Sequence, residues 1–300
     1  MSSLLIVGST ALDTIHTPKA SHERLLGGSA NHAALAAALW TTVRLVGIVG
    51  TDFPKRYIRL LEGKGIDLSG LQVAEGPTFF WEGEYEQDMN RRRTLRTELG
   101  VFEHFEPRLP ESYQQTPYVF LANIAPSLQR HVLRQMKGRK FVAADTMDLW
   151  LRTAREELRR LLREIDLLIL NDSEARDLAG EENLFRAARK IRRMGPEFVI
   201  VKKGEHGSFL MGPEGIFLCP AYPVERVVDP TGAGDSFAGG LMGYLAQVGG
   251  QPARVLRRAM LYGAAVAAFC CEGFGVRRTA RLDRAEVEER VKELRSMVRV

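Results

Sequence analysis

Two aspartates bracket a run of small residues in the segment VVDPTGAGDSFAGG, residues 227–240. Apolar residues at helical spacing follow the loop Thr231–Gly234, which predicts a helix that begins near Asp235. Backbone N–H groups of such a loop, together with those at the helix start and the helix dipole, form a site for an anion such as a phosphate. A carboxylate beside that site can take a proton from a hydroxyl group. Helix capping is the alternative for Asp235, but capping does not require the preceding glycines. The pattern therefore predicts phosphoryl transfer.

The residues DPTGAGD resemble the signature of the ribokinase-like (PfkB) family of carbohydrate and nucleoside kinases. They do not form a Walker A loop, because no Gly-Lys-Ser/Thr ends the run. The resemblance implies that Asp235 is the catalytic base and that Gly232, Ala233 and Gly234 supply the anion-hole amides. It also implies that Thr231 lies by the ATP and that Asp229 lies near a site for a monovalent cation such as K⁺.

Residues near the start of the chain are candidates for binding the acceptor. Asp13 follows the predicted strand Leu4–Gly8, and Gly27-Gly28 precedes an Ala-rich helix. The resemblance implies that Asp13 binds hydroxyl groups of the acceptor and that the two glycines let the backbone approach it. Relatives usually carry Asn four residues after the second Gly. His32 stands there in this chain and Asn31 stands one residue earlier, so either side chain could face the substrate or only begin the helix.

Two further segments are similar to the ATP-binding elements of the family. Asn171 and Glu174 follow an apolar strand and match an Asn-x-x-Glu element, which implies Mg²⁺ held near Glu174, through water or directly. Oxygen ligands suit such a hard cation, whereas helix capping is the structural alternative. The turn KKGEHG implies nucleotide contacts from Lys203, Gly204 and Gly207, although a plain β-turn explains the glycines equally well.

Short apolar, β-branched runs alternate with helical patterns, and this order is typical of a mostly parallel sheet covered on both faces. The predicted strands are 4–8, 43–49, 118–121, 140–144, 166–170 and 198–202. The predicted helices are 29–40, 54–64, 149–163, 184–194, 235–247, 252–271 and 283–297, and a hairpin is expected around 212–215. We therefore expect one α/β domain over residues 1–300, and the resemblance to the family implies a ribokinase-like three-layer α/β/α sandwich.

The stretch from Leu71 to Phe102 breaks this order, because Thr and aromatic residues alternate with polar ones and no helical period is present. We interpret residues 71–102 as a small inserted antiparallel sheet of about four strands. Such an insertion can close over the acceptor as a lid or join two copies of the chain in a homodimer. A surface hairpin without a role is the alternative.

Composition limits the remaining classes. The 300 residues carry a formal net charge of +5, without a clustered basic stripe, so anionic small molecules are expected as partners and nucleic acid is not. The three cysteines do not suggest a disulfide framework, and no apolar run is long enough to span a membrane, so a cytoplasmic location without a membrane partner is expected.

The sequence thus predicts an ATP-dependent, Mg²⁺-dependent kinase that phosphorylates a hydroxymethyl group of a sugar. A nucleoside kinase of the same family is the first alternative, since aromatic residues in the predicted lid could stack on a base. A non-catalytic sugar- or nucleotide-binding regulator on the same fold is the second alternative.

Overall fold

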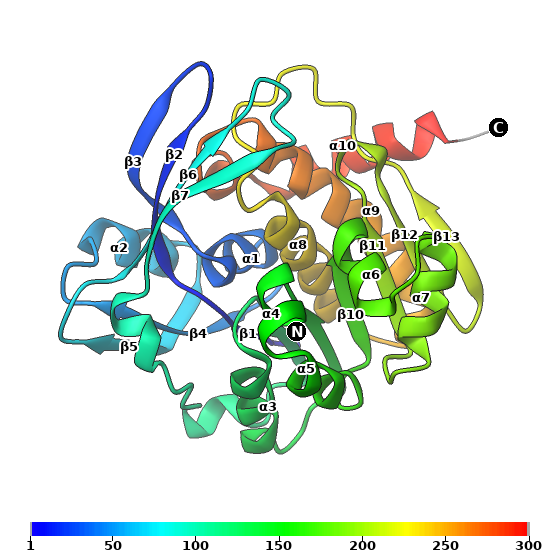
Figure 1. Cartoon of the computed structure of the whole chain (residues 1–300), viewed down its shortest axis with the longest axis horizontal. Helices are drawn as coiled ribbons and strands as arrows, with labels where there is room; N and C mark the ends of the chain where they lie inside the picture. The colour runs from blue at the N-terminus through cyan, green and yellow to red at the C-terminus, as the bar shows by residue number, and fades with distance from the viewer. Residues whose placement is uncertain (1, 299–300) are drawn as a thin grey trace.

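The computed structural model describes residues 2–298, in which a nine-stranded sheet lies between two layers of helices (Figure 1). The strand order is β13-β12-β11-β10-β9-β8-β1-β4-β5, and all neighbours are parallel except β12 with β11 and with β13. The strands are β1 (Leu4–Val7), β4 (Val43–Gly50), β5 (Ile66–Ala74), β8 (Tyr118–Leu121), β9 (Phe141–Asp145), β10 (Leu167–Asn171), β11 (Phe198–Lys202), β12 (Ser208–Gly212) and β13 (Gly215–Cys219). The predicted α/β class with a mostly parallel sheet is confirmed.

Alternate residues of the sheet enter two separate cores, as the period of a strand requires. Leu4 and Ile6 of β1 pack into one core, whereas Leu5 and Val7 pack into the other. The first core is covered by α1 (Ser29–Ala37), α2 (Lys55–Gly63), α8 (Ala233–Val248), α9 (Pro252–Cys271) and α10 (Arg284–Met297). The second is covered by α3 (Pro126–Gln135), α4 (Asp148–Thr153), α5 (Arg155–Leu162), α6 (Asp172–Ala179) and α7 (Leu184–Arg192).

The helical segment predicted over 149–163 is two helices. The chain turns at Ala154, whose φ of −137° and ψ of 32° are not helical, so α4 ends and α5 begins there. The predicted hairpin around residues 212–215 is confirmed: Gly212 pairs with Gly215, and β12 and β13 extend the sheet at one edge. Within residues 2–298, no helix has the length and apolar character that crossing a membrane would require.

A second sheet of four strands, which we call the lid, stands above the carboxyl ends of the central strands (Figure 1). Its order is β3-β2-β6-β7, built from β2 (Ala11–His16), β3 (Ser21–Gly27), β6 (Phe79–Tyr85) and β7 (Arg92–Glu98). The prediction that residues 71–102 form the whole lid is therefore wrong. Residues 66–74 are the edge strand β5 of the central sheet, and half of the lid comes from the N-terminal hairpin, since β2 pairs in parallel with β6.

Glycines of α8 let this helix lie directly against its neighbours. A Cβ atom on Gly239 would stand 2.2 Å from the carbonyl oxygen of Ala33 in α1, and one on Gly243 would stand 2.7 Å from the Cα atom of Ala37. On the α9 side, a Cβ atom on Gly263 would stand 2.7 Å from the carbonyl oxygen of Phe237. Each of these glycines weakens an isolated helix, by about 1 kcal/mol relative to Ala, but together they let α8 pack directly against α1 and α9.

Candidate active site

The loop before α8 has the form of an anion-binding helix start. Gly232 is the N-cap residue with φ +76°, and the helix begins at Ala233, two residues before the predicted start. The amides of Ala233 and Gly234 therefore belong to the first helical turn, where N–H groups have no partner inside the helix. The Ala233 N–H group donates to the Pro230 carbonyl oxygen at 3.1 Å, outside the helix. Asp235 lies in the same turn. The predicted base and the predicted anion-hole amides are thus adjacent at one helix N-terminus.

Asp229 ties this loop to a second segment of the chain. Its Oδ1 atom accepts a hydrogen bond of 2.9 Å from the Thr231 N–H group, and its Oδ2 atom accepts one of 2.8 Å from the Gly275 N–H group. The side chain is fully buried, and burial raises its pKa. Because both carboxylate oxygens hold the backbone, Asp229 has a structural role in the loop. Its role beside a monovalent cation stays a prediction.

His32 lies directly beneath Gly232. A Cβ atom on Gly232 would stand 2.2 Å from Nδ1 of the imidazole, so this position needs glycine both for its φ angle and for space. Burial lowers the pKa of His32 to about 4, which keeps the ring neutral. Cys270 completes the packing: its Sγ atom lies 3.4 Å from the Thr231 carbonyl oxygen. The structure thus gives His32 a supporting role under the anion loop.

Asp13 and Asn31 form the other side of the site. Asp13 belongs to lid strand β2, a strand that was not predicted, and its carboxylate lies over Gly27. A Cβ atom on Gly27 would stand 1.9 Å from Oδ2 of Asp13, so glycine is required there. Asn31 donates from Nδ2 to the Gly27 carbonyl oxygen at 2.7 Å, while its buried Oδ1 atom has no partner among the described residues. Gly28, with φ +89°, packs against the Ser9 carbonyl oxygen.

Two carboxylates of the site are held in an environment that disfavours their charge. Burial raises the pKa of Asp13 to about 7, and the negative charges of Asp229 and Asp235 add to this effect. Burial likewise raises the pKa of Asp235 to about 7, with the Asp145 charge acting in the same direction and Lys202 opposing it. A general base is most effective when its pKa lies near the working pH. Asp235 is therefore suited to take up a proton at neutral pH.

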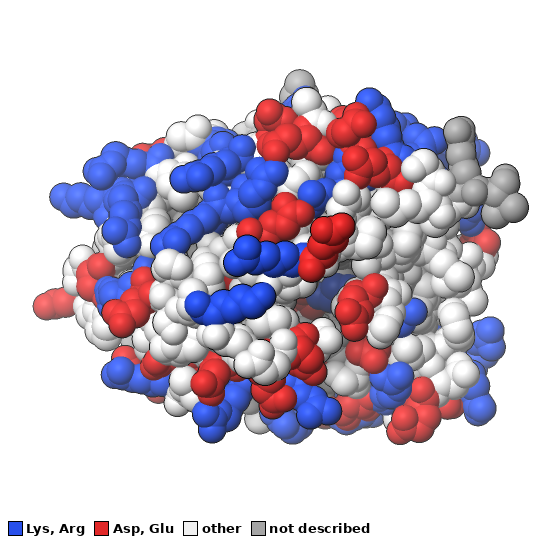
Figure 2. Space-filling view, turned by 90° about the horizontal axis from the view of Figure 1, so that it is seen from above, with Lys and Arg blue, Asp and Glu red and all other residues white. Residues whose placement is uncertain are grey.

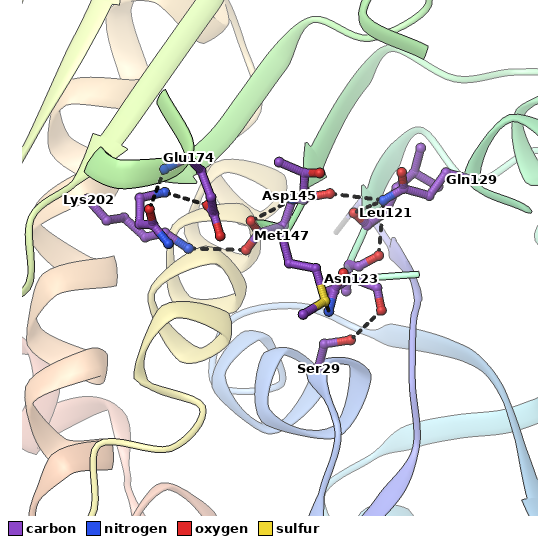
Figure 3. A network of polar contacts seen from close by, with 11 residues as sticks. Ser29, Leu121, Asn123, Gln129, Asp145, Met147, Glu174 and Lys202 are labelled. Carbon is purple, nitrogen blue, oxygen red and sulfur yellow. Dashed lines mark hydrogen bonds and ion pairs between the residues drawn. The ribbon is translucent and has the colours of Figure 1, made fainter. Parts of the chain in front are cut away.

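A buried ion pair that the sequence analysis did not use lies beside Asp235. Nζ of Lys202, at the end of β11, lies 3.1 Å from Oδ2 of Asp145, at the end of β9 (Figure 3). Glu174 follows β10, between these two strands in the sheet. The position of both residues at the ends of strands could have indicated this pair, because the carboxyl ends of neighbouring parallel strands meet at one edge of the sheet.

Asn171 and Glu174 begin α6 through a reciprocal capping arrangement. Oδ1 of Asn171 accepts from the Glu174 N–H group at 2.8 Å, and Oε2 of Glu174 accepts from the Asn171 N–H group at 2.8 Å. The capping alternative is thus confirmed, and it leaves Oε1 of Glu174 for a ligand. Burial and the charge of Asp145 raise the pKa of Glu174 to about 7. A cation bound beside Glu174 would therefore stabilise the charged form of this carboxylate.

A cavity of about 830 Å³ extends from the anion loop toward α9. Ala233 and Gly234 line one end, Gly204 and Gly207 line its side, and Ala264 belongs to its apolar wall. This volume suits a nucleotide. Lys203, a predicted nucleotide contact, does not line the cavity, whereas its neighbour Lys202 does. Lys202 is the last residue of β11, whereas Lys203 lies outside the strand, with φ −132° and ψ 34°.

The lid is fastened to the anion loop by one hydrogen bond, of 2.9 Å, between the Tyr85 hydroxyl group and Oγ1 of Thr231. Burial raises the pKa of Tyr85 to about 12. The turn after β6 adds Asp88, Met89 and Asn90 to the lining of the cavity. The lid therefore borders this cavity and also carries Asp13, a predicted acceptor contact.

A smaller polar network links the start of α1 to the ends of β8 and β9 (Figure 3). Oγ of Ser29 donates to the Asn123 carbonyl oxygen at 3.3 Å, and Nε1 of Trp150 donates to Oδ1 of Asn123 at 2.8 Å. Asn123 was not singled out by the sequence, because it belongs to no recognisable motif. These contacts fix the helix that carries Asn31 relative to the central sheet.

Comparisons with known proteins agree with this arrangement. The family model described as pfkB family carbohydrate kinase matches residues 1–281. A cytidine kinase of Thermococcus kodakarensis is 32% identical over 253 residues, which cover 81% of this chain and 89% of that protein. A nucleoside kinase of Methanocaldococcus jannaschii is 26% identical over 288 residues, 92% of each chain.

Solved structures agree on the fold. The crystal structure of the Methanocaldococcus jannaschii nucleoside kinase, described as an archaeal member of the ribokinase family, superposes with a TM-score of 0.78 at 24% identity and covers 98% of this chain and 99% of that one. Arabidopsis thaliana ribokinase complexed with ribose and ATP superposes with a TM-score of 0.78 at 25% identity and covers 97% and 99%. The predicted ribokinase-like fold is confirmed.

Proposed function

We propose that this chain phosphorylates the hydroxymethyl group of a nucleoside. The chain belongs to the PfkB family of carbohydrate kinases and is an ATP-dependent sugar or nucleoside kinase. The nucleoside is preferred over a free sugar because the two relatives reported above from the sequence comparison, which align over 81% and 92% of this chain, are named as a cytidine kinase and a nucleoside kinase. One observation carries the phosphotransfer itself: Asp235 lies in the first turn of α8, beside the amides of the anion loop.

The residues of the site suggest the following roles. Asp235 accepts the proton of the acceptor hydroxyl group, whose oxygen forms a bond to the γ-phosphorus as the bond to the β–γ bridging oxygen breaks and ADP departs. The amides of Gly232, Ala233 and Gly234 stabilise the charge of the transferring group. Asp13 and the free Oδ1 atom of Asn31 accept hydrogen bonds from hydroxyl groups of the acceptor.

ATP binds in the 830 Å³ cavity, with contacts from Gly204 and Gly207. Bound Mg²⁺ would neutralise charge on the phosphates, and Glu174 would hold it through Oε1 or a water molecule. The arrangement fits this ion, because the raised pKa of Glu174 marks a carboxylate whose charge the protein only partly compensates. Closure of the lid excludes water, which would otherwise compete with the acceptor.

The test is an assay of ADP formation from Mg²⁺·ATP with cytidine, other nucleosides and free ribose, in which Asp235→Asn serves as the blank. Nucleoside-dependent turnover that disappears in the blank supports the proposal. Turnover with ribose alone would reassign the acceptor to a free sugar. Binding of ATP and nucleoside without turnover would favour the regulator, and equal turnover in the blank would reject Asp235 as the base.

Three finer features also belong to this proposal. Residues 1–300 act as one catalytic unit. A monovalent cation such as K⁺ supports the anion loop near Asp229, which activity in KCl compared with choline chloride would reveal. A homodimer forms through the lid, and light scattering of the purified chain tests it.

Figure 2 shows Lys and Arg gathered over part of the upper face, and their positive charge would draw anionic ATP toward the site.

A further inference from the structure

Lys202 has a position that its role as the last residue of β11 does not explain. Its side chain is 19% exposed and points toward the N-terminus of α8. A Cβ atom on Gly234 would stand 3.0 Å from Nζ of Lys202, so the ammonium group lies in contact with the anion loop. Of the described residues that line the nucleotide cavity, Lys202 is the one Lys or Arg.

The ammonium group is held in its charged form by the residues around it. Burial alone would lower the pKa of Lys202, but the carboxylates of Asp145, Glu174 and Asp235 outweigh burial and raise it. Asp145 makes the direct contact and is only 6% exposed. Its other oxygen, Oδ1, accepts from the Thr146 N–H group at 2.8 Å, which fixes the carboxylate.

A buried ion pair is an expensive way to stabilise a fold, because the cost of desolvating both charges is comparable to their attraction. Lys202 also lines the cavity, and the carboxylates around its ammonium group, those of Asp145, Glu174 and Asp235, would repel an anionic ligand without it. A fixed cation beside the N-terminus of a helix is instead an arrangement that binds a phosphate. A bound phosphate therefore explains the position of Lys202 better than a purely structural role does.

We propose that Lys202 binds the terminal phosphate of ATP together with the Gly234 amide, and that Asp145 is a positioning residue that holds the ammonium group in place. This inference rests on the proposed kinase function and deepens it. The terminal phosphate is favoured over the other two because Lys202 lies within electrostatic reach of Asp235, the base that must face the transferring group. The remainder of the nucleotide lies further along the cavity, toward Gly207 and Ala264.

Calorimetric titration of the full chain with ADP and with a non-hydrolysable ATP analogue, both with Mg²⁺, tests the contact directly. Loss of one charge-assisted hydrogen bond predicts that Lys202→Met weakens binding of the analogue at least about tenfold more than binding of ADP. Lys202→Arg should restore part of the difference. Lys190→Met, on the exposed surface of α7, is the matched control and should change neither affinity. Equal losses for both nucleotides, or no loss, would overturn the proposal.

Asp145→Asn tests the positioning role through a readout that a merely structural residue would not move. Because Asp145 raises the pKa of Asp235, its removal should shift the acidic limb of the kcat profile to lower pH while the KM for ATP increases. An unmoved limb with an unchanged KM would reject this role. The double variant Lys202→Met/Asp145→Asn removes the pair as a unit and keeps the selectivity test available if Lys202→Met alone does not fold.

The two proposals fail in different ways. Wild-type protein that binds neither nucleotide would reject the kinase function. Wild-type protein that phosphorylates a nucleoside, with a Lys202→Met variant as selective for the analogue over ADP as the wild type, would reject only the contact between Lys202 and the terminal phosphate.

Discussion

Asp235→Asn should stabilise the protein at alkaline pH while it abolishes turnover. The carboxylate has a pKa near 7 in the folded chain, because burial and the charge of Asp145 disfavour ionisation. An ordinary aspartate, as in the unfolded chain, has a pKa of about 4. The folded state therefore holds its proton more tightly, so this group contributes stability below about pH 4 that is lost as the pH rises through 7.

The size of the effect follows from the difference between the two pKa values. For a fully buried group that difference is worth about 4 kcal/mol, and because Asp235 is only half-buried we reduce it to about 2 kcal/mol. Asn keeps the shape of the side chain without its charge. We therefore expect Asp235→Asn to be about 2 kcal/mol more stable than the wild type at pH 8, or about 4 °C in Tm. The gain should shrink progressively between pH 7 and pH 4.

Thermal and urea unfolding of both proteins at pH 5 and pH 8 measure this gain, and steady-state kinetics on the same samples measure the loss of turnover. Glu62→Gln, which removes an exposed carboxylate from α2, is the control and should leave the stability nearly unchanged. A gain of equal size at both pH values would show that packing and not charge is responsible. No gain at pH 8, or a fall in kcat of less than about tenfold, would refute the reasoning about Asp235.

Three further predictions concern the acceptor side. The acidic limb of kcat/KM should fall below about pH 7, at least about tenfold per pH unit, because Asp235 must be ionised to accept a proton and Asp13 to bind hydroxyl groups; a flat profile down to pH 5.5 would contradict it. Gly27→Ala should weaken acceptor binding while ATP binding is kept, because its Cβ atom would stand 1.9 Å from the Asp13 carboxylate. Gly63→Ala, where no atom lies within 4 Å, is the matched control for calorimetry. Tyr85→Phe should remove the hydrogen bond between the lid and the anion loop, worth about 1 kcal/mol, and raise the acceptor KM about fivefold. The rate of ATP hydrolysis by water should rise as well. Unchanged values of both would show that the lid has no part in the mechanism.

The chemistry of the anion loop could be predicted from local sequence because it depends on local structure. A helix start and a carboxylate in its first turn are contiguous in the chain, so the run Gly232–Asp235 indicated a kinase before any fold was known. The central sheet was predictable for a similar reason. Apolar β-branched runs between helical patterns have one common solution, a parallel sheet buried on both faces.

The lid could not be delimited in this way. Its two halves are some fifty residues or more apart in the chain and meet only because β2 pairs with β6. The alternation in residues 71–102 was real, but edge strand β5 of the central sheet shows nearly the same pattern as lid strands β6 and β7. Which sheet a strand joins is decided by its partner, and strand pairing over long separations has no local signature.

By itself, the sequence determined the anion loop, the layered fold and the class of reaction, since each is encoded in contiguous residues. Tertiary structure alone decided that Lys202 and not Lys203 reaches the cavity, that Asp145 pairs with it, and that His32 lies beneath the loop. The physical reason is the same in each case. The direction of a side chain, its burial and its pKa depend on neighbours contributed by other strands and helices, and those neighbours meet only when the chain is folded.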